Sequence, residues 1–450
     1  MHNAQKMSPE WLQSLLERDT PAPKLYAWGL SNVQSHSASS DRPERSSVDS
    51  KLLRRQDDSH RRVYILGVGN LGALFASSLA SLPSPPPVTL VFHRKELLLS
   101  WQQNPGIEII RGGIVQKHSN FDVELWSEEP PSEGQSREVS DGRIIHNLLV
   151  TTKASQALPE VDRVRRYLNA NSTVAFAQNG MCKMWPPHGT LYNSARFSED
   201  QSTTHPNWLA CVTTHGVTSL GRFKSLHASE ADVKVGPVLP NPRTSSSASY
   251  LSGLLVQAPH LRGTSVPRDD LWILQLEKLV VNSIINPLTA ILRCKNGQLF
   301  AGEEGAFLKR LMDQLLNEAS GVLRGLVNDP STDSILQAST GDGMPAETDE
   351  VRNDLLERFS QPRLRHMLYD VGHKVRENTS SMLQDVRAGK PTEVDEFNGW
   401  LVEMAAYLGK HLEIACHQTL IGLVKNGDVL DTASLSQKFS HLVPVDPVSA

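Results

Sequence analysis

The feature that most constrains this chain is a glycine-rich turn between a short apolar run and an apolar-periodic segment. Residues 63–66 are a predicted buried strand, residues 71–82 are a predicted helix, and Gly67-Val68-Gly69-Asn70-Leu71-Gly72 joins them. In such a turn the first glycine permits the tight bend, the second lets a pyrophosphate approach the backbone, and the third lets the helix lie close to the strand. The turn predicts a dinucleotide site at the helix N-terminus, and the alternative is a glycine-rich turn without a ligand.

The segments after this turn predict an α/β domain. Further strands are expected at 88–92, 107–110, 147–152, 174–177 and 209–214, alternating with helical or loop stretches. Such alternation predicts a parallel sheet covered on both faces, here a Rossmann-type domain over residues 61–262. The stretch 237–249, which contains proline, asparagine and a serine run, is expected to be a linker or the loop before a new helix.

Beyond this domain the apolar periodicity is helical almost throughout. Helices are expected at 270–285, 302–326, 347–357, 362–376 and 393–408, which predicts an all-α second domain over residues 263–440. Pro287 is expected to kink or end the first of these helices. The polar segment 328–349 is expected to be a surface insertion, and residues 441–450 a frayed tail.

Composition limits which binding partners and which cellular compartment are expected for this chain. Residues 1–60 hold few aliphatic side chains and are predicted to be a mostly disordered tail with a short helix at Trp11. The formal charge of -4 and the absence of a long apolar run exclude a polycationic nucleic-acid surface and a membrane span. The four scattered cysteines predict neither a zinc cage nor a disulfide framework, and no metal site is expected. We expect a cytoplasmic protein, with mitochondrial import and a homodimer left open.

Polar residues follow several of the predicted strands, where open α/β sheets bind ligands. The second strand ends without the acidic residue typical of NAD sites and runs into Arg94, whose guanidinium suits the 2′-phosphate of NADP(H). Lys153 is placed for phosphate or substrate, Asn179 for the cofactor or a substrate carbonyl, and Gly216 for the cofactor. The alternative for Arg94 is that it lies in a solvent-exposed basic turn. The alternative for Lys153, Asn179 and Gly216 is that they are ordinary loop residues that bind no ligand.

Polar residues also share one face of the helix predicted from residue 270. Asn282 and Asn286 are rotated by about 40° and about 80° from Lys278, at 3.6 residues per turn. The alternative is that these three residues form the solvent-exposed side of an amphipathic helix. A later cluster contains Asn378, Ser381 and Glu393, which begins the next apolar-periodic segment. Its serines could cap a helix or donate hydroxyls to an anion, and Glu393 could simply complement the dipole of that helix.

Together these segments resemble the ketopantoate reductase (2-dehydropantoate 2-reductase) family from about residue 62 to about residue 430. The motifs that carry the resemblance are the glycine turn, Lys153, Gln178-Asn179-Gly180, Lys278 to Ala290, Asn296-Gly297, and Ser380-Ser381-Met382-Leu383-Gln384-Asp385 with Glu393. The resemblance implies a Rossmann domain that binds NADPH, a helical domain as in 6-phosphogluconate dehydrogenases, and substrate held between them. It implies that Lys278 is the acid, that Glu393 is a second catalytic residue at the cofactor or substrate side, and that Asn282, Asn286, Asn296, Asn378 and Ser381 hold the substrate.

The expected reaction is therefore NADPH-dependent reduction of ketopantoate to pantoate, a step toward pantothenate. Reduction of a 2-oxo acid needs proton-donating character at the developing alkoxide, which a lysine supplies, and amides can orient a carboxylate without adding negative charge. Two alternatives remain open at this point. One is reduction of another 2-oxo acid by the same residues, and the other is a non-catalytic protein that binds NADPH and regulates.

Overall fold

The computed structural model describes residues 8–18, 21–33, 58–197, 204–241, 244–303, 306–337, 345–409 and 412–443. The chain forms two compact units. The sheet unit comprises Leu15–Trp185 and Gly189–Pro267, and the helical unit comprises Met1–Ser14, Pro186–His188 and Arg268–Ala450. Within the described ranges, no helix combines the length and apolar character needed to cross a membrane.

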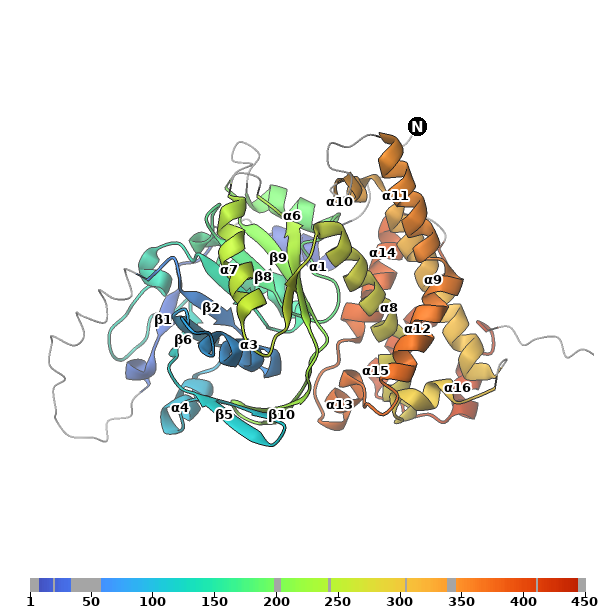
Figure 1. Cartoon of the computed structure of the whole chain (residues 1–450), viewed down its shortest axis with the longest axis horizontal. Helices are drawn as coiled ribbons and strands as arrows, with labels where there is room; N and C mark the ends of the chain where they lie inside the picture. Colours follow the sequence, from blue (N-terminus) through green and yellow to red (C-terminus); the bar gives the residue numbers. More distant parts are fainter. Residues whose placement is uncertain are drawn as a thin grey trace, which may run out of the picture. The chain divides into compact units, whose positions relative to one another are not determined.

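The sheet unit is built on a nine-stranded sheet (Figure 1). Its strands lie in the order β1 (Tyr26–Trp28), β6 (Asp122–Ser127), β3 (Val88–Phe92), β2 (Val63–Leu66), β7 (Asn147–Val150), β8 (Thr173–Phe176), β9 (Asn207–Thr213), β12 (Val233–Leu239) and β13 (Gly263–Ser265). The strands from β6 to β9 run parallel, which confirms the predicted Rossmann-type sheet. Strand β1 pairs antiparallel with β6, and β12 pairs antiparallel with β9 and parallel with β13. The central strands β2, β7 and β8 are buried along their whole length, as expected for a sheet covered on both faces.

Helices pack around this sheet, and the strands of a second sheet contact α3. The helices are α3 (Asn70–Ala80), α4 (Lys95–Gln103), α5 (Ala154–Arg163), α6 (His188–Arg196) and α7 (Ser245–Gln257), with short 3₁₀ turns η1 (Leu30–Asn32), η2 (Val139–Gly142) and η3 (Arg165–Tyr167). Helices α3 and α7 lie side by side on one face (Figure 1), where Ala175 and Leu209 join their core. The neighbouring residues Phe176 and Trp208 point to the opposite face and stack with ring centroids 6.2 Å apart.

One predicted strand lies outside the parallel sheet. Residues 107–110 belong to β4 (Ile107–Arg111) of a separate four-stranded sheet, in the order β10 (Gly216–Gly221), β11 (Lys224–Ser229), β4 and β5 (Ile114–His118). The prediction failed because β4 is buried on one face only, with Ile107 and Ile109 turned toward the core. The tight turn at Gly112 and Gly113, both at positive φ, then folds β5 back against it.

Part of the N-terminal segment that we expected to be a tail is integral to the sheet unit. Strand β1 pairs with β6, Leu25 and Ala27 are buried, and the Leu25 backbone N–H donates to the Tyr167 hydroxyl at 2.8 Å. A three-residue strand has no periodic sequence signal, so its pairing with β6, 97 to 101 residues later in the chain, decides its fold. Of the remaining expected tail, residues 1–7, 19–20 and 34–57 lie outside the described residues.

The predicted N-terminal helix is present as α1 (Glu10–Leu16) and docks in the helical unit. Leu12 is completely buried, and the Trp11 indole N–H donates to Glu403 Oε2 at 2.9 Å. The ring of His188 lies edge-on to Trp11, with centroids 5.9 Å apart, and its Nδ1 contacts the same carboxylate at 2.9 Å. The chain therefore starts in the helical unit, enters the sheet unit, and returns.

The helical unit confirms the predicted all-α second domain. Its long helices are α8 (Arg268–Leu292), α9 (Phe307–Val327), α11 (Pro345–Arg358), α12 (Gln361–Lys374) and α15 (Ala415–Asn426). Shorter elements are η5 (Asn296–Phe300), η6 (Pro330–Thr332), α10 (Asp333–Leu336), α13 (Ser381–Arg387), the π-helical turn η8 (Asp395–Gly399), α14 (Trp400–Leu408) and α16 (Thr432–Lys438). Helices α9, α12 and α14 pack together, and α8 packs against α13 and α15 (Figure 1).

Pro287 does not end α8, which was one of the two outcomes expected of it. Proline lacks the N–H that would bond the carbonyl of Ser283 one turn earlier. That carbonyl instead accepts a hydrogen bond from Asn398 Nδ2 at 2.8 Å. A side chain from η8 thus replaces the missing backbone donor, and the helix continues to Leu292.

The expected segment boundaries also shift. Strand β13 belongs to the large sheet, so the helical unit resumes at Arg268 rather than at residue 263. The described parts of the expected insertion, 328–337 and 345–349, form η6, α10 and the start of α11, and Ile335 and Leu336 are fully buried. Residues 237–239 end β12 and residues 245–249 begin α7, so the described residues between them precede a new helix, which is one of the two alternatives expected for 237–249. Val443 is buried, and residues 444–450 lie outside the described residues.

Candidate active site

The glycine turn between β2 and α3 has the geometry that its sequence predicts. A Cβ on Gly67, which has φ 94°, would lie 2.8 Å from Thr152 Cγ2, and a Cβ on Gly72 would lie 2.2 Å from the Gly67 carbonyl oxygen. At Gly69 no atom lies within 4 Å of the corresponding position. Gly67 and Gly72 are therefore required by close packing, whereas Gly69 leaves open space in which a phosphate can approach the backbone.

The side chains of this turn point into the protein. Val68 and Leu71 pack against the core. The Asn70 amide donates to the Val217 carbonyl at 3.3 Å and accepts from the Ser225 hydroxyl at 3.2 Å. Helix α3 has no side-chain cap at Gly69. The turn thus offers its backbone, rather than these side chains, to an anion at the helix N-terminus.

The other predicted cofactor residues lie at the same edge of the sheet. Strands β3, β2, β7 and β8 are adjacent and parallel, so the turns that carry Arg94, the glycine motif, Lys153 and Asn179 follow their carboxyl ends side by side. Arg94 is exposed at the start of α4, whereas the neighbouring Lys95 ammonium lies 5.7 Å from the centre of the Trp28 ring. Partial desolvation and the neighbouring Arg94 charge lower the pKa of His93.

Two buried polar atoms at this edge lack a hydrogen-bond partner among the described residues. They are Thr152 Oγ1, after β7, and Gln178 Nε2, after β8. Unsatisfied buried polar atoms are rare and call for an explanation, such as a ligand that completes the bonding. Sequence reasoning included Gln178 only as part of the Gln178-Asn179-Gly180 motif and gave Thr152 no role. Burial without a hydrogen-bond partner is what distinguishes these two groups.

Gly216 begins β10 and lies beyond the end of β9. The preceding His215 is buried, and its Nδ1 lies 2.9 Å from Nε2 of His227. Arg111 Nε donates to Nδ1 of His227 at 3.0 Å, and burial is the main reason that the pKa of His227 is lowered to about 4. This neutral imidazole pair joins β10 to β11 and β4, as expected for structural histidines.

The predicted catalytic face lies on α8, in the helical unit. Lys278 and Asn282 are partly exposed, and Asn286 is buried. Thr289 is rotated by about 20° from Lys278 and so belongs to the same face, which sequence reasoning did not include. The face therefore presents a cation, two amides and a hydroxyl.

Lys278 has an environment suited to proton transfer near neutral pH. Burial lowers the pKa of its ammonium from 10.5 to about 8, and the carboxylate of Glu393 acts in the opposite direction. A group that donates a proton during a reaction works best with a pKa near the operating pH. Glu393 is 9% exposed and lies two residues before the π-helical turn η8, a type of distortion often found at functional sites.

The predicted substrate residues Asn296 and Asn378 are held together by their backbones. The Asn296 N–H donates to the Asn378 carbonyl at 3.1 Å, and Asn296 Nδ2 donates to the Val375 carbonyl at 3.3 Å. Asn296 Oδ1 is buried and has no partner among the described residues, whereas the Asn378 side chain is exposed. Asn296 Oδ1 is therefore available to accept a hydrogen bond from a ligand.

The adjacent serines take different roles. Ser380 is the N-cap of α13, and its Oγ accepts from the Leu383 N–H at 3.2 Å. The same oxygen lies 2.7 Å from Thr289 Oγ1, which places the N-terminus of α13 beside the polar face of α8. The exposed Ser381 makes no cap, so its hydroxyl can face a substrate.

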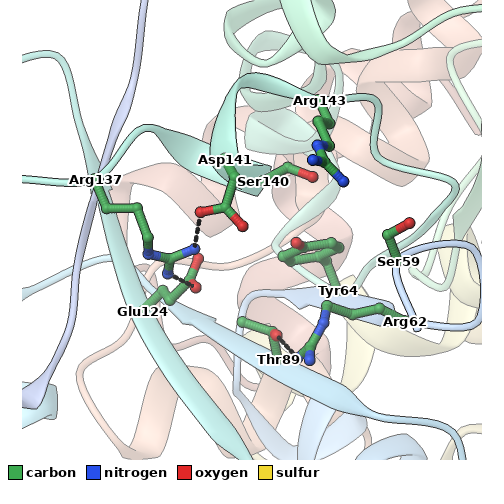
Figure 2. Close-up of a pocket in the computed structure, with 9 residues that line it drawn as sticks. All are labelled: Ser59, Arg62, Tyr64, Thr89, Glu124, Arg137, Ser140, Asp141 and Arg143. Carbon is green, nitrogen blue, oxygen red and sulfur yellow. Dashed lines mark hydrogen bonds and ion pairs between the residues drawn. The ribbon is translucent and has the colours of Figure 1, made fainter. Parts of the chain in front are cut away.

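A small polar cavity near the amino ends of β2 and β3 is not a substrate site. Figure 2 shows Arg137 between the carboxylates of Glu124 and Asp141, with Arg62 bonded to Thr89. Its volume of about 20 Å³ holds roughly one water molecule. Across the described residues no three His, Cys, Asp or Glu side chains are grouped as metal ligands.

Comparison with known proteins finds matches within both units of the chain. Residues 63–240 match the family model described as ketopantoate reductase PanE/ApbA, and residues 270–428 match its C-terminal model. Ketoisovalerate reductases of Gibberella fujikuroi and Beauveria bassiana are 40% and 41% identical and cover 96% of this chain and 99% and 98% of their own. A protein named probable 2-dehydropantoate 2-reductase from Schizosaccharomyces pombe is 28% identical over 81% of this chain and 95% of its own.

Solved structures share the fold. A probable 2-dehydropantoate 2-reductase from Bacillus subtilis superposes with a TM-score of 0.54 at 22% identity and covers 82% of this chain and 100% of its own. A D-mandelate dehydrogenase solved with NADH and anilino(oxo)acetate gives a TM-score of 0.56 at 16% identity, covering 81% of this chain and 97% of its own. At these identities the likeness concerns the arrangement of the chain only.

Proposed function

This chain belongs to the ketopantoate reductase family, and we propose that it reduces the branched 2-oxo acid 2-ketoisovalerate to 2-hydroxyisovalerate with NADPH. The observation that carries the proposal is its identity of 40% to a ketoisovalerate reductase over 96% of this chain and 99% of the relative. This similarity includes N-terminal residues that lie outside the family model, which starts at residue 63.

Ketopantoate is the second candidate substrate, as the family resemblance implies. Both family models match this chain, and the relative from Schizosaccharomyces pombe is named a probable 2-dehydropantoate 2-reductase. The two acids share the 2-oxo carboxylate and a branched third carbon, and ketopantoate carries an additional hydroxymethyl group. Discrimination between them therefore depends on whether the site favours that hydroxyl, and a site built to bond a hydroxyl rejects the analogue that lacks it.

The proposed cofactor, when bound, supplies the hydride. The open space at Gly69 and the unpartnered Thr152 Oγ1 and Gln178 Nε2 fit a dinucleotide at the carboxyl edge of the sheet. Arg94 is proposed to bond the 2′-phosphate, because a guanidinium forms charge-assisted bonds with phosphate oxygens. Lys153, Asn179 and Gly216 are proposed to complete the cofactor site.

The helical unit is proposed to bind the acid and to supply the proton. Lys278 holds a proton that it donates to the oxygen on C2 as the hydroxyl forms, and Glu393 keeps the ammonium protonated at neutral pH. Asn282, Asn286, Asn296, Asn378 and Ser381 are proposed to orient the carboxylate and the oxo group, as amides and hydroxyls can do without adding negative charge. Asn179 is proposed to contact the substrate as well.

The test is a comparison of kcat/KM for NADPH oxidation with 2-ketoisovalerate, ketopantoate and pyruvate. We expect kcat/KM for 2-ketoisovalerate to exceed that for ketopantoate by at least about tenfold, or about 1.4 kcal/mol. A higher kcat/KM for ketopantoate would assign the second candidate. Absence of turnover with all three acids, in a protein that still binds NADPH, would reject catalysis of this class.

The cofactor part of the proposal has its own measurement. Wild-type protein should prefer NADPH to NADH by at least about tenfold, the size expected of one charge-assisted contact. The Arg94→Ala variant should lose most of that preference by weakening NADPH alone. If the variant discriminates between the cofactors as well as wild type does, another residue binds the 2′-phosphate.

A further inference from the structure

A hollow of about 660 Å³ on the helical unit is lined by four cationic side chains, and none of the residues proposed for catalysis lines it. Arg293 follows α8, Lys295 precedes η5, Arg376 follows α12, and Arg387 ends α13. We propose that this hollow, the basic pocket, binds a small-molecule anion that carries phosphoryl groups. This site would be additional to the cofactor and substrate sites of the proposed function.

The basic pocket has a net positive charge. Glu377 is its one acidic lining residue, and it lies 3.5 Å from both Lys295 Nζ and Arg376 Nε. Arg293 and Arg387 form no ion pair with any described residue. Four cations and one carboxylate leave a formal charge of +3, and two of the guanidinium groups lack a counterion within the described part of the chain.

Helix dipoles account for only part of this charge. The pocket lies at the C-terminal ends of α8, α12 and α13, where basic side chains offset the partial negative charge of the last carbonyl groups. Each helix end carries about half an elementary charge, so three ends contribute roughly -1.5. An excess of positive charge remains, and a bound anion would neutralise it.

The chemistry of the lining favours phosphoryl groups on a molecule larger than a five-carbon acid. Arginine presents a planar fork of donors that matches phosphate oxygens, and the pocket contains three arginines. Its volume lies in the range of roughly 300–1,000 Å³ typical of cofactor-sized ligands. The rings of Phe300 and His373, with centroids 6.5 Å apart, give it an aromatic wall for an apolar or base moiety.

Two glycines bring the walls of the basic pocket together. A Cβ on Gly372 would lie 2.4 Å from the Phe300 ring, and a Cβ on Gly297 would lie 2.8 Å from Arg376 Cβ. The Gly297 N–H also donates to the Arg376 carbonyl at 2.9 Å. Backbone contacts thus fix η5 against the end of α12, so the cations are presented from a rigid frame.

Calorimetric titration of the full chain tests the proposal, with inorganic pyrophosphate and ADP as separate probes. Saturating NADPH is present throughout, so that the glycine turn is occupied. The Arg293→Gln/Arg387→Gln double variant removes the two cations without ion-pair partners. The matched control is Arg363→Gln, an exposed arginine on α12 that does not line the pocket.

We expect wild type and the control to bind both probes with similar dissociation constants, and the double variant to bind each at least about tenfold more weakly. Tighter binding of ADP than of pyrophosphate would show that the aromatic wall contributes, and equal binding that the phosphoryl groups suffice. The proposal is overturned if neither probe binds at millimolar concentration, or if the double variant binds as wild type does.

Discussion

The hydroxyl oxygens of Thr289 and Ser380 lie 2.7 Å apart and join α8 to the first turn of α13. Thr289 also bonds the Ile285 carbonyl at 2.8 Å, and Ser380 accepts from the Leu383 N–H. These bonds are satisfied together when Thr289 donates to its own helix and Ser380 donates to Thr289. One pair of hydroxyls therefore sets where Ser381 lies relative to the Lys278 face.

The Thr289→Val variant should weaken substrate binding more than cofactor binding. Valine removes the acceptor of a buried hydroxyl, which costs about 1–3 kcal/mol of stability, and it releases the N-terminus of α13. We expect a raised KM for the 2-oxo acid, an unchanged Kd for NADPH, and recovery in Thr289→Ser. Thr419→Val is the matched control, because the Thr419 hydroxyl bonds only the Ala415 carbonyl of its own helix among the contacts described. Equal KM changes in both valine variants would refute the positioning role of Thr289.

The pH dependence of reduction should report Lys278. The reaction needs the protonated ammonium, so kcat/KM should be constant at low pH and fall as pH rises through about 8, the pKa that burial gives this lysine. Glu393 raises that pKa, so Glu393→Gln should move the break to lower pH. A break that stays in place would show that Glu393 does not set the protonation of Lys278.

Removal of the ammonium should affect chemistry rather than cofactor binding. Lys278→Ala should lower kcat by roughly two to four orders of magnitude, the usual contribution of a general acid, while NADPH binds as in wild type. In Lys278→Arg any remaining activity should show no break near pH 8, because a guanidinium stays protonated there. Loss of NADPH binding in Lys278→Ala would instead indicate a structural lysine.

The described N-terminal segments should be needed for stability, contrary to the expectation that residues 1–60 are mostly a disordered tail. A chain that starts at Ser59 loses the buried Leu12, Leu25 and Ala27 and leaves an edge of β6 unpaired. We expect a lower melting temperature and aggregation. Leu25→Ala alone should cost about 2–5 kcal/mol of stability. A truncated chain that melts at the wild-type temperature would restore the view of this segment as a tail.

Sequence patterns correctly predicted the features that depend on residues close together in the chain. They failed for the features that depend on contacts between residues far apart in the chain. The glycine turn and the polar face of α8 follow from spacing within a few residues of Gly67 and Lys278. The continuation of α8 past Pro287 depends on Asn398, more than a hundred residues later, which bonds the carbonyl that proline leaves unpaired. The cap at Ser380 was anticipated as an option, but its bond to Thr289 joins segments 91 residues apart.

The glycine turn permits a test that separates folding from cofactor binding. A Cβ on Gly69 meets no atom within 4 Å, and its φ of -85° suits any residue, so Gly69→Ala should fold and melt as wild type does. The added methyl group would occupy the space proposed for the pyrophosphate, so the Kd for NADPH should rise at least about tenfold.

Gly72→Ala is the matched variant, with the same chemical change three residues later. Its methyl group would lie 2.2 Å from the Gly67 carbonyl oxygen, closer than any packing allows, so α3 must move away from β2 and the melting temperature should fall. The two variants thus separate the roles of the two glycines by thermal melting and NADPH titration. If Gly69→Ala binds NADPH as tightly as wild type does, the dinucleotide does not approach this backbone, and the turn is only a means of packing a helix on a strand.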